Sequence, residues 1–295
     1  MGWISREIGQ AALDQQGYRI KIIPHRRGER SIIASMQPET QKISISIVSH
    51  GQTALVDRLL KSLDRHHAGV DFEVILTENI SPQYAIENKP GTYELHRIFN
   101  SNPRGLAANH NQAFRSSTGD FVCLVNPDVV FVENVFPQLI SDIKTGLADI
   151  AAPLIVNTSG MVQDSFRTLP TPVTLVKRMI QSTGFTLPDV HQDFIYPDWI
   201  AGIILCMHRD TFQKLGGMDE GYYLYFEDVD FCTRARLANY RILVDTRVRA
   251  VHEAGRHSRK NLRYFLMHVR SAARFFLSKP YRATRRPPGK PESSS

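Results

Sequence analysis

Apolar runs alternate with helical segments from residue 43 onward. Residues 43–49 form a β-branched run typical of a buried strand, and residues 53–63 repeat leucine at helical spacing. The alternation continues through the first half of the chain, with further strands expected at 72–77, 93–99 and 120–125 and further helices at 109–116 and 135–145. Strands that alternate with helices at these intervals predict right-handed crossovers and an α/β fold built on a mainly parallel sheet.

The second half of the chain is less regular. Strands are expected at 199–206, 241–244 and 248–252, and an acidic, aromatic stretch lies at 215–232. From Glu227 onward, apolar residues recur at helical spacing up to residue 238. Glu227 and Asp228 therefore fall in the first turn of an expected helix.

Two interpretations of this acidic pair are open. Acids in the first turn are favoured by the helix macrodipole by roughly 0.3–1 kcal/mol each, so Glu227 and Asp228 could simply cap the helix. The stretch also holds Asp219, Glu220 and Asp230 among aromatic residues. Burying a carboxylate without a partner is costly, so a cationic or hydroxyl partner is expected, and clustered acids also mark catalytic sites.

Polar residues follow the expected strands of the first half. Ser49 and His50 end the first strand, and Glu78 and Asn79 follow the second. An Asn-Pro-Asp turn at 126–128 follows the strand at 120–125. Because ligands of open parallel sheets bind beyond the carboxyl ends of the strands, these residues predict a ligand site at one sheet edge.

The sequence carries neither a dinucleotide fingerprint nor a P-loop. A bound pyrophosphate would instead be neutralised by a divalent cation, Mg²⁺ or Mn²⁺, held by Asp128. A plain turn is the alternative for residues 126–128, since Asn, Pro and Asp all favour turns. His252 ends the strand at 248–252 and is either a hydrogen-bonded surface residue or a metal ligand.

The length of the chain suits one large domain with appendages, or two small domains. The chain has 295 residues, of which 42% are hydrophobic and 22% charged, as in ordinary globular proteins. No segment has the pattern of a secretory signal, and the longest uncharged apolar run, 199–207, is half the length that a bilayer requires. Three widely spaced cysteines give no zinc or disulfide pattern. A cytoplasmic protein without a nucleic-acid partner is expected.

The two ends of the chain differ from its centre. Residues 1–41 form an extension of unknown role, in which short strands at 18–24 and 31–35 could pair. Residues 259–295 combine an amphipathic helix at 260–276 with a basic, Pro-rich end. Residues 256–295 contain eleven Lys or Arg and one acid, so this segment has a net charge of +10 and the rest of the chain has −3. The helix could pack on the domain or contact an anionic membrane.

The order of these motifs resembles the inverting glycosyltransferases of family two, and in particular the rhamnosyltransferase-like branch of bacterial surface polysaccharide synthesis. The resemblance covers about residues 43–258. It rests on motifs at 47–50, 77–81, 102–109, 124–128, 199–202, 216–220, 226–230 and 251–252. It implies a GT-A type α/β fold, with a nucleotide-sugar-binding half at 42–130 and an acceptor and catalytic half at 131–258.

The resemblance also implies roles for individual residues. Asp228 matches the general base, with Glu227 beside it, and Asp128 matches the main metal ligand, with His252 completing the site. Glu78 stands where the family usually has an Asp that contacts the nucleoside. Further nucleotide-sugar contacts fall on Ser49, His50, Asn79, Gly105, Asn109, Asn126 and Gly202, and acceptor contacts on Trp199, Asp219 and Glu220.

The implied activity is a metal-dependent, inverting transfer of a sugar such as rhamnose. The donor would be dTDP- or UDP-linked and the acceptor a saccharide carried on a lipid, so the enzyme would work at the inner face of the cell membrane. The positive end of the helix would keep Asp228 ionised. The alternatives are a sugar nucleotidyltransferase, and an inactive relative that binds anionic membranes or polyanions through the basic tail.

Overall fold

The computed structural model describes residues 12–13, 19–20, 41–67, 69–82, 91, 93–180, 192–253 and 262–285. The chain forms two units, Met1–Gln41 and Lys42–Ser295. In the first unit, β1 (Ala12–Leu13) pairs antiparallel with β2 (Arg19–Ile20). The strand expected at 31–35 lies outside the described residues, as does most of the one expected at 18–24.

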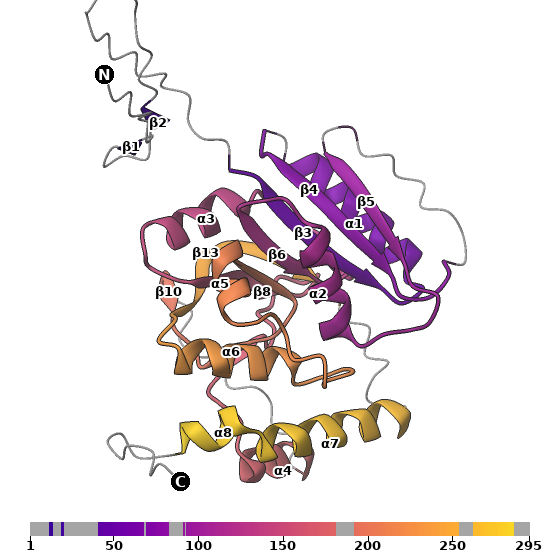
Figure 1. Ribbon diagram of the computed structural model, residues 1–295, viewed down its shortest axis with the longest axis vertical. Helices are drawn as coiled ribbons and strands as arrows, with labels where there is room; N and C mark the ends of the chain where they lie inside the picture. The colour runs from indigo at the N-terminus through magenta and orange to yellow at the C-terminus, as the bar shows by residue number, and fades with distance from the viewer. Residues whose placement is uncertain are drawn as a thin grey trace, which may run out of the picture. The chain divides into compact units, whose positions relative to one another are not determined.

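A sheet of nine strands, counted over the described residues, forms the centre of the second unit (Figure 1). Six strands share one direction: β3 (Ile43–Ser49), β4 (Phe72–Glu78), β5 (Glu94–Phe99), β6 (Phe121–Val125), β8 (Ile150–Val156) and β13 (Ile242–His252). β12 (Ile204–His208) runs antiparallel between β6 and β8. β7 (Val129–Phe131) and β10 (Phe194–Ile195) pair antiparallel with β13. The carboxyl ends of the six strands therefore meet at one sheet edge.

Helices cover both faces of this sheet, so the residues of its central strands are buried on both sides. α1 (Thr53–His66) and α3 (Phe136–Lys144) bury their apolar residues against one face. The other face packs against three helices: α2 (Leu106–Ser116), α5 (Arg209–Lys214) and α6 (Glu227–Leu237).

A further layer covers α6 on the side away from the sheet (Figure 1). It consists of α4 (Pro172–Ile180), α7 (Leu262–Leu277) and α8 (Lys279–Thr284). Ala272 and Phe275 of α7 are buried against Phe226 and Val229, at the start of α6. The helix expected at 260–276 is thus present as α7, and part of its apolar stripe packs on the domain.

Several strands differ from the sequence-based expectation, and among the short ones β7, β10 and the strand at 166–167 were not expected. The strand expected at 199–206 is divided into β11 (Trp199–Ile200), which pairs with β9 (Phe166–Arg167), and β12. The two strands expected at 241–244 and 248–252 are one strand, β13. β8 was not expected at all. Its Pro153 argues against a central strand, and the structure accommodates this proline opposite a register shift in β13.

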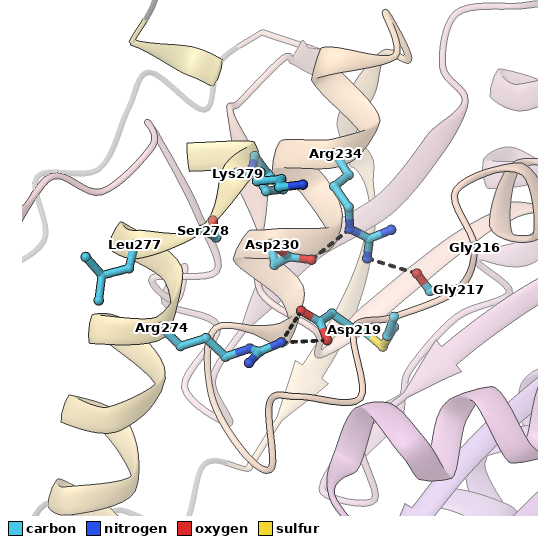
Figure 2. A pocket seen from close by; sticks show the side chains of 11 residues that line it. Gly216, Gly217, Asp219, Asp230, Arg234, Arg274, Leu277, Ser278 and Lys279 are labelled. Atoms are coloured by element: carbon cyan, nitrogen blue, oxygen red, sulfur yellow. Dashed lines mark hydrogen bonds and ion pairs between the residues drawn. The ribbon is translucent and has the colours of Figure 1, made fainter. Parts of the chain in front are cut away.

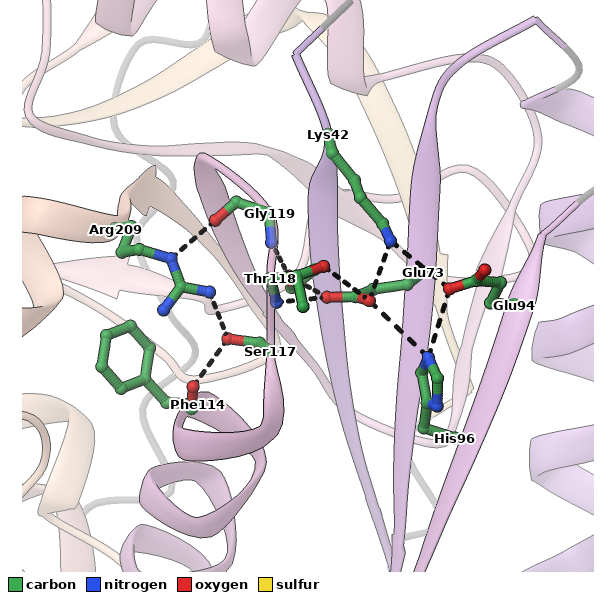
Figure 3. Close-up of polar contacts among 10 residues, drawn as sticks. Lys42, Glu73, Glu94, His96, Phe114, Ser117, Thr118, Gly119 and Arg209 are labelled. Atoms are coloured by element: carbon green, nitrogen blue, oxygen red, sulfur yellow. Dashed lines mark hydrogen bonds and ion pairs between the residues drawn. The ribbon is translucent and has the colours of Figure 1, made fainter.

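Glu73 joins three segments at the amino-terminal edge of the sheet (Figure 3). Its buried carboxylate accepts hydrogen bonds from the Ser44 hydroxyl at 2.7 Å and the Thr118 N–H at 2.6 Å, and it pairs with the Lys42 ammonium at 3.0 Å. Burial alone would raise the pKa of Glu73, but these donors lower it to about 2. Glu73 therefore stabilises the fold in its ionised form.

We expect Glu73→Gln to destabilise the protein by roughly 2–3 kcal/mol at pH 7. A carboxyl group with a lowered pKa contributes stability above its unfolded value and loses it as the pH falls through the folded value. The difference from wild type should therefore shrink between about pH 4.5 and pH 2 in urea unfolding experiments.

Glu94→Gln is the matched control, because Glu94 also pairs with Lys42 but is 68% exposed. Exposed pairs contribute about 0–1 kcal/mol, so this variant should unfold close to wild type. Equal stability of Glu73→Gln and wild type at pH 7 would contradict the assignment.

Candidate functional site

The carboxyl edge of the sheet gathers most of the polar residues singled out from the sequence. Ser49, Glu78, Asn126 and His252 end or directly follow strands that share one direction. β12 runs in the opposite direction and begins at Ile204, so Gly202, two residues earlier, lies at the same edge. The prediction that the strand ends form one cluster is consistent with this topology.

Asp128 and His252 face each other at this edge. The Asp128 Oδ2 atom lies 3.2 Å from His252 Nε2, and the register of β7 with β13 brings the two residues together. Asp128 Oδ1 is buried and has no hydrogen-bond partner among the described residues. A carboxylate oxygen held in this way is free to bind a cation.

Gln163, which sequence reasoning missed, determines the tautomer of His252. Its side-chain N–H₂ donates to the His252 carbonyl at 2.7 Å, so its oxygen, 2.8 Å from Nδ1, must accept from that ring nitrogen. A neutral His252 then presents a bare Nε2 lone pair toward the Asp128 carboxylate. Two acceptors at this distance repel each other unless a proton or a metal ion lies close to them. The pair therefore fits a divalent cation, with Gln163 orienting the imidazole.

Another group of candidate ligands lies at the opposite edge. One ligand atom from each of Glu73, Glu94 and His96 falls within 4.8 Å of the others. The Lys42 ammonium already pairs with both carboxylates (Figure 3). Because β4 and β5 begin there, this group is far from the strand ends where a nucleotide would bind.

Glu78 keeps one carboxylate oxygen available at the carboxyl edge. Arg97 of β5 donates to Oε1 with its Nε at 2.8 Å, and Oε2 is buried without a partner among the described residues. Arg97 also lies over the exposed Phe99 ring, 4.9 Å from its centroid. Sequence reasoning missed both residues, because only the pairing of β4 with β5 brings them beside Glu78.

Asn79 and Asn109 shape the neighbouring loop. Asn79 accepts from the Arg104 N–H at 2.7 Å and donates to the Arg104 carbonyl at 2.8 Å. Asn109 is fully buried and bonds to Asn100 and Arg104. His50 contacts the Asn79 amide at 3.3 Å. These amides are engaged within the chain, so they hold the loop in shape; their contact with a nucleotide stays a prediction.

Gly105 is required by packing. A Cβ atom at this position would lie 2.9 Å from the Tyr223 Cα, which is closer than two such carbon atoms can approach. The adjacent Leu106 N–H donates to the Tyr223 carbonyl at 2.8 Å. Gly105 therefore lets the start of α2 lie directly against the loop that leads into α6.

Glu227 and Asp228 begin α6, as the sequence predicts. Asp228 Oδ1 accepts from the N–H of the next residue, Val229, at 2.8 Å. Its Oδ2 accepts from the Gly202 N–H at 3.0 Å, in the turn between β11 and β12. Glu227 is buried, and its Oε2 has no partner among the described residues. The N-cap position of α6 is Phe226, and no side chain makes a capping hydrogen bond there, so side-chain capping does not account for this pair.

Burial dominates the acid–base behaviour of the pair. Burial, together with the neighbouring Asp228 charge, raises the pKa of Glu227 to about 8. Burial also raises the pKa of Asp228, although the Gly202 and Val229 N–H groups oppose this. We expected the helix terminus to hold Asp228 ionised; the desolvation of the site outweighs that effect. A carboxylate with a raised pKa is a stronger base.

The residues expected at the acceptor site have partners within the chain. Asp219 pairs with Arg274 of α7 at 2.8 Å, and Glu220 accepts from the Asn111 amide at 3.0 Å. The Trp199 indole donates to the Thr168 carbonyl at 3.1 Å, and β11, which contains Trp199, contacts α6. Their role in binding an acceptor stays a prediction. The structure shows only that Asp219 and Glu220 fix the loop before α6.

Comparison with known proteins assigns the fold and the family. Residues 44–197, more than half of the chain, match the family described as glycosyl transferase family 2. The chain belongs to this family. It is 24% identical over 251 residues to the rhamnosyltransferase WbbL of Escherichia coli (strain K12), which covers 80% of this chain and 93% of WbbL.

Two further proteins support this assignment. The chain is 27% identical to the N-acetylglucosaminyl-diphospho-decaprenol L-rhamnosyltransferase of Mycobacterium tuberculosis (strain CDC 1551 / Oshkosh). The match spans 131 residues, which are 41% of this chain and 43% of the relative. The crystal structure of GalNAc-T7 with UDP, GalNAc and Mn²⁺ superposes with a TM-score of 0.55 at 16% identity, over 73% of this chain and 43% of that one. The expected GT-A fold and glycosyltransferase class are confirmed. Within the described residues, no helix is long and apolar enough to cross a membrane.

Proposed function

We propose that this glycosyltransferase moves a sugar, such as the deoxyhexose rhamnose, with inversion from a UDP- or dTDP-linked donor to a lipid-linked saccharide. The reaction would belong to surface polysaccharide synthesis at the inner face of the cell membrane. The observation that carries the proposal is the placement of two different groups at one sheet edge. Asp128 with His252 fits a cation, and Asp228 is a partly buried carboxylate with a raised pKa.

Asp128 and His252 would hold Mg²⁺ or Mn²⁺, with Gln163 fixing the imidazole. The metal would neutralise the charge that develops on the departing diphosphate. Glu78 Oε2 would accept a hydrogen bond from the nucleoside, because it is a buried acceptor without a partner among the described residues. The loop held by Asn79 and Asn109 would line the nucleotide site.

Asp228 would accept the proton of the acceptor hydroxyl as that oxygen attacks the anomeric carbon. In a single displacement the nucleotide diphosphate leaves from the opposite face of the sugar, so the configuration inverts. The Gly202 and Val229 N–H groups orient the Asp228 carboxylate. Glu227, with its pKa raised to about 8, would be largely protonated at neutral pH, which leaves Asp228 as the base.

We expect Asp128→Ala to abolish Mn²⁺-dependent nucleotide binding, and His252→Ala to weaken it less, because a neutral ligand contributes less charge. Gln163→Leu should weaken binding roughly tenfold through loss of the oriented imidazole. Titration calorimetry with UDP and dTDP, with and without MnCl₂, measures these affinities. Glu73→Gln, at the opposite edge, is the control. Unchanged Mn²⁺-dependent affinity in Asp128→Ala would overturn the metal site.

We expect Asp228→Asn to lower turnover by at least about 10²-fold while nucleotide affinity stays close to wild type. The amide keeps the volume of the side chain, and its single oxygen can still accept one of the two hydrogen bonds, from Gly202 or from Val229. Release of UDP or dTDP from a panel of nucleotide sugars, with polyprenyl diphosphate-linked N-acetylglucosamine as acceptor, gives the rate. A wild-type protein that binds nucleotide but transfers no sugar would support the inactive-relative alternative.

The membrane contact would use the outer layer formed by α4, α7 and α8. These three helices contain no Asp or Glu, but seven Lys or Arg. Several of their apolar side chains remain exposed: Val173, Val176, Leu262, Leu266, Val269 and Leu277. Exposed apolar residues among cationic ones are typical of a surface that lies on an anionic bilayer.

We expect the protein to sediment with phosphatidylglycerol vesicles but not with phosphatidylcholine vesicles, and to be released at about 0.5 M salt. The double change Leu262→Ser with Leu266→Ser should weaken this binding. Leu237→Ser is the matched control, because Leu237 is an exposed leucine on α6, outside this layer. Equal sedimentation with both vesicle types, or full binding by the double variant, would exclude this surface as the anchor.

A further inference from the structure

The loop that leads into α6 has an unfavourable backbone. Tyr225 and Phe226, the two residues before Glu227, have φ angles of 71° and 66°. Bulky residues in this left-handed region cost on the order of 1–3 kcal/mol each, so surrounding contacts must hold them there. Their conformation sets the direction in which Glu227 and Asp228 leave the loop. Whatever holds these two residues therefore controls the catalytic pair.

α7 contacts this loop at three successive points. Arg274 pairs with Asp219 and lies over the Tyr222 ring, 5.0 Å from its centroid (Figure 2). The buried Ser271 hydroxyl donates to the Leu224 carbonyl at 2.8 Å, directly before the two strained residues. Phe275, which is completely buried, packs against Phe226 with their ring centroids 5.6 Å apart.

The contacts from α7 lie away from the reacting groups. A cavity of about 600 Å³ lies between the loop, α6 and the junction of α7 with α8 (Figure 2). Asp230 and Arg234 of α6 line this cavity. These two residues are two and six positions after Asp228 on α6, so they lie on the opposite side of the helix. α7 therefore acts on Asp228 through the loop and the start of α6, without a contact to its carboxylate among the described residues.

α2 holds the same loop from its other side. The Asn111 amide exchanges two hydrogen bonds with the Met218 backbone, at 2.8 and 2.9 Å, and Leu106 bonds to the Tyr223 carbonyl. These contacts fix the beginning and the middle of the loop. The contacts to Leu224 and Phe226, next to the catalytic pair, come from α7.

We propose that α7 is a positioning element, and that the hydrogen bond from Ser271 to Leu224 holds the backbone that aims Asp228. The inference rests on the proposed function only for its kinetic consequence. According to this proposal, α7 both positions Asp228 and forms part of the proposed membrane-contact surface. Ser271 and Phe275 act through Leu224 and Phe226, and neither touches the substrate.

The test compares two serine-to-alanine changes in the same outer layer. Ser271→Ala removes the bond to Leu224, whereas Ser278→Ala removes the N-terminal cap of α8, which bonds to the Tyr281 N–H at 3.2 Å. Both should lower the melting temperature by a few degrees, since each loses about 1 kcal/mol. Hydrogen exchange of peptides covering residues 219–230 reports directly on the loop.

In Ser271→Ala, exchange in this loop should rise and kcat should fall roughly 10- to 100-fold, with KM for the nucleotide sugar within about twofold of wild type. Ser278→Ala should leave both loop exchange and kcat unchanged. Unaltered loop exchange in Ser271→Ala overturns the proposal whatever the enzymatic activity, as does an equal loss of kcat in Ser278→Ala. A wild type without transferase activity refutes the proposed function instead, and the exchange data still decide whether α7 holds the loop.

Discussion

The desolvation of two adjacent carboxylates, the buried Glu227 and the partly buried Asp228, is the constraint on which the rest of the proposed site depends. It is only partly offset by the Gly202 and Val229 N–H groups. The surrounding fold keeps the pair in place, because it holds the strained loop before α6 and brings Gly202, in the turn between β11 and β12, to Asp228. The raised pKa of Asp228 suits the role of general base that we propose for it.

The proposed cation site rests on one contact. Gln163 accepts from the Nδ1–H of His252, and the other ring nitrogen, Nε2, lies 3.2 Å from the Asp128 Oδ2 atom. A positive charge close to this contact, either a proton or a metal ion, would stabilise it. In the proposed mechanism the two halves of the site are complementary, since one position would bind a cation and the other would supply a base on a different segment of the chain.

The outer layer of helices connects this chemistry to the surface. One side of α7 packs on the loop before α6, and another exposes leucines beside arginines. α4, which comes from the middle of the sequence, joins the same layer through Leu175. α7 therefore packs on the domain with one side and leaves apolar residues exposed on another, as its two proposed roles, in positioning Asp228 and in membrane contact, require.

The sequence alone determined the alternating strands and helices of the first half, the polar strand ends, and the helix that begins at Glu227. These features follow from local periodicity and from the rule that parallel strands bring their ends together. Only the tertiary structure decided the partners that give these residues their properties. Arg97 and Gln163 carry no local signal, since each acts through a contact between residues far apart in the sequence. Gly202 belongs to a recognisable motif, but its hydrogen bond to Asp228 appears only in the structure. β8 was not predicted because a proline such as Pro153 is unusual in a central strand. In the structure Pro153 lies opposite a register shift in β13, which only the pairing of the two strands reveals.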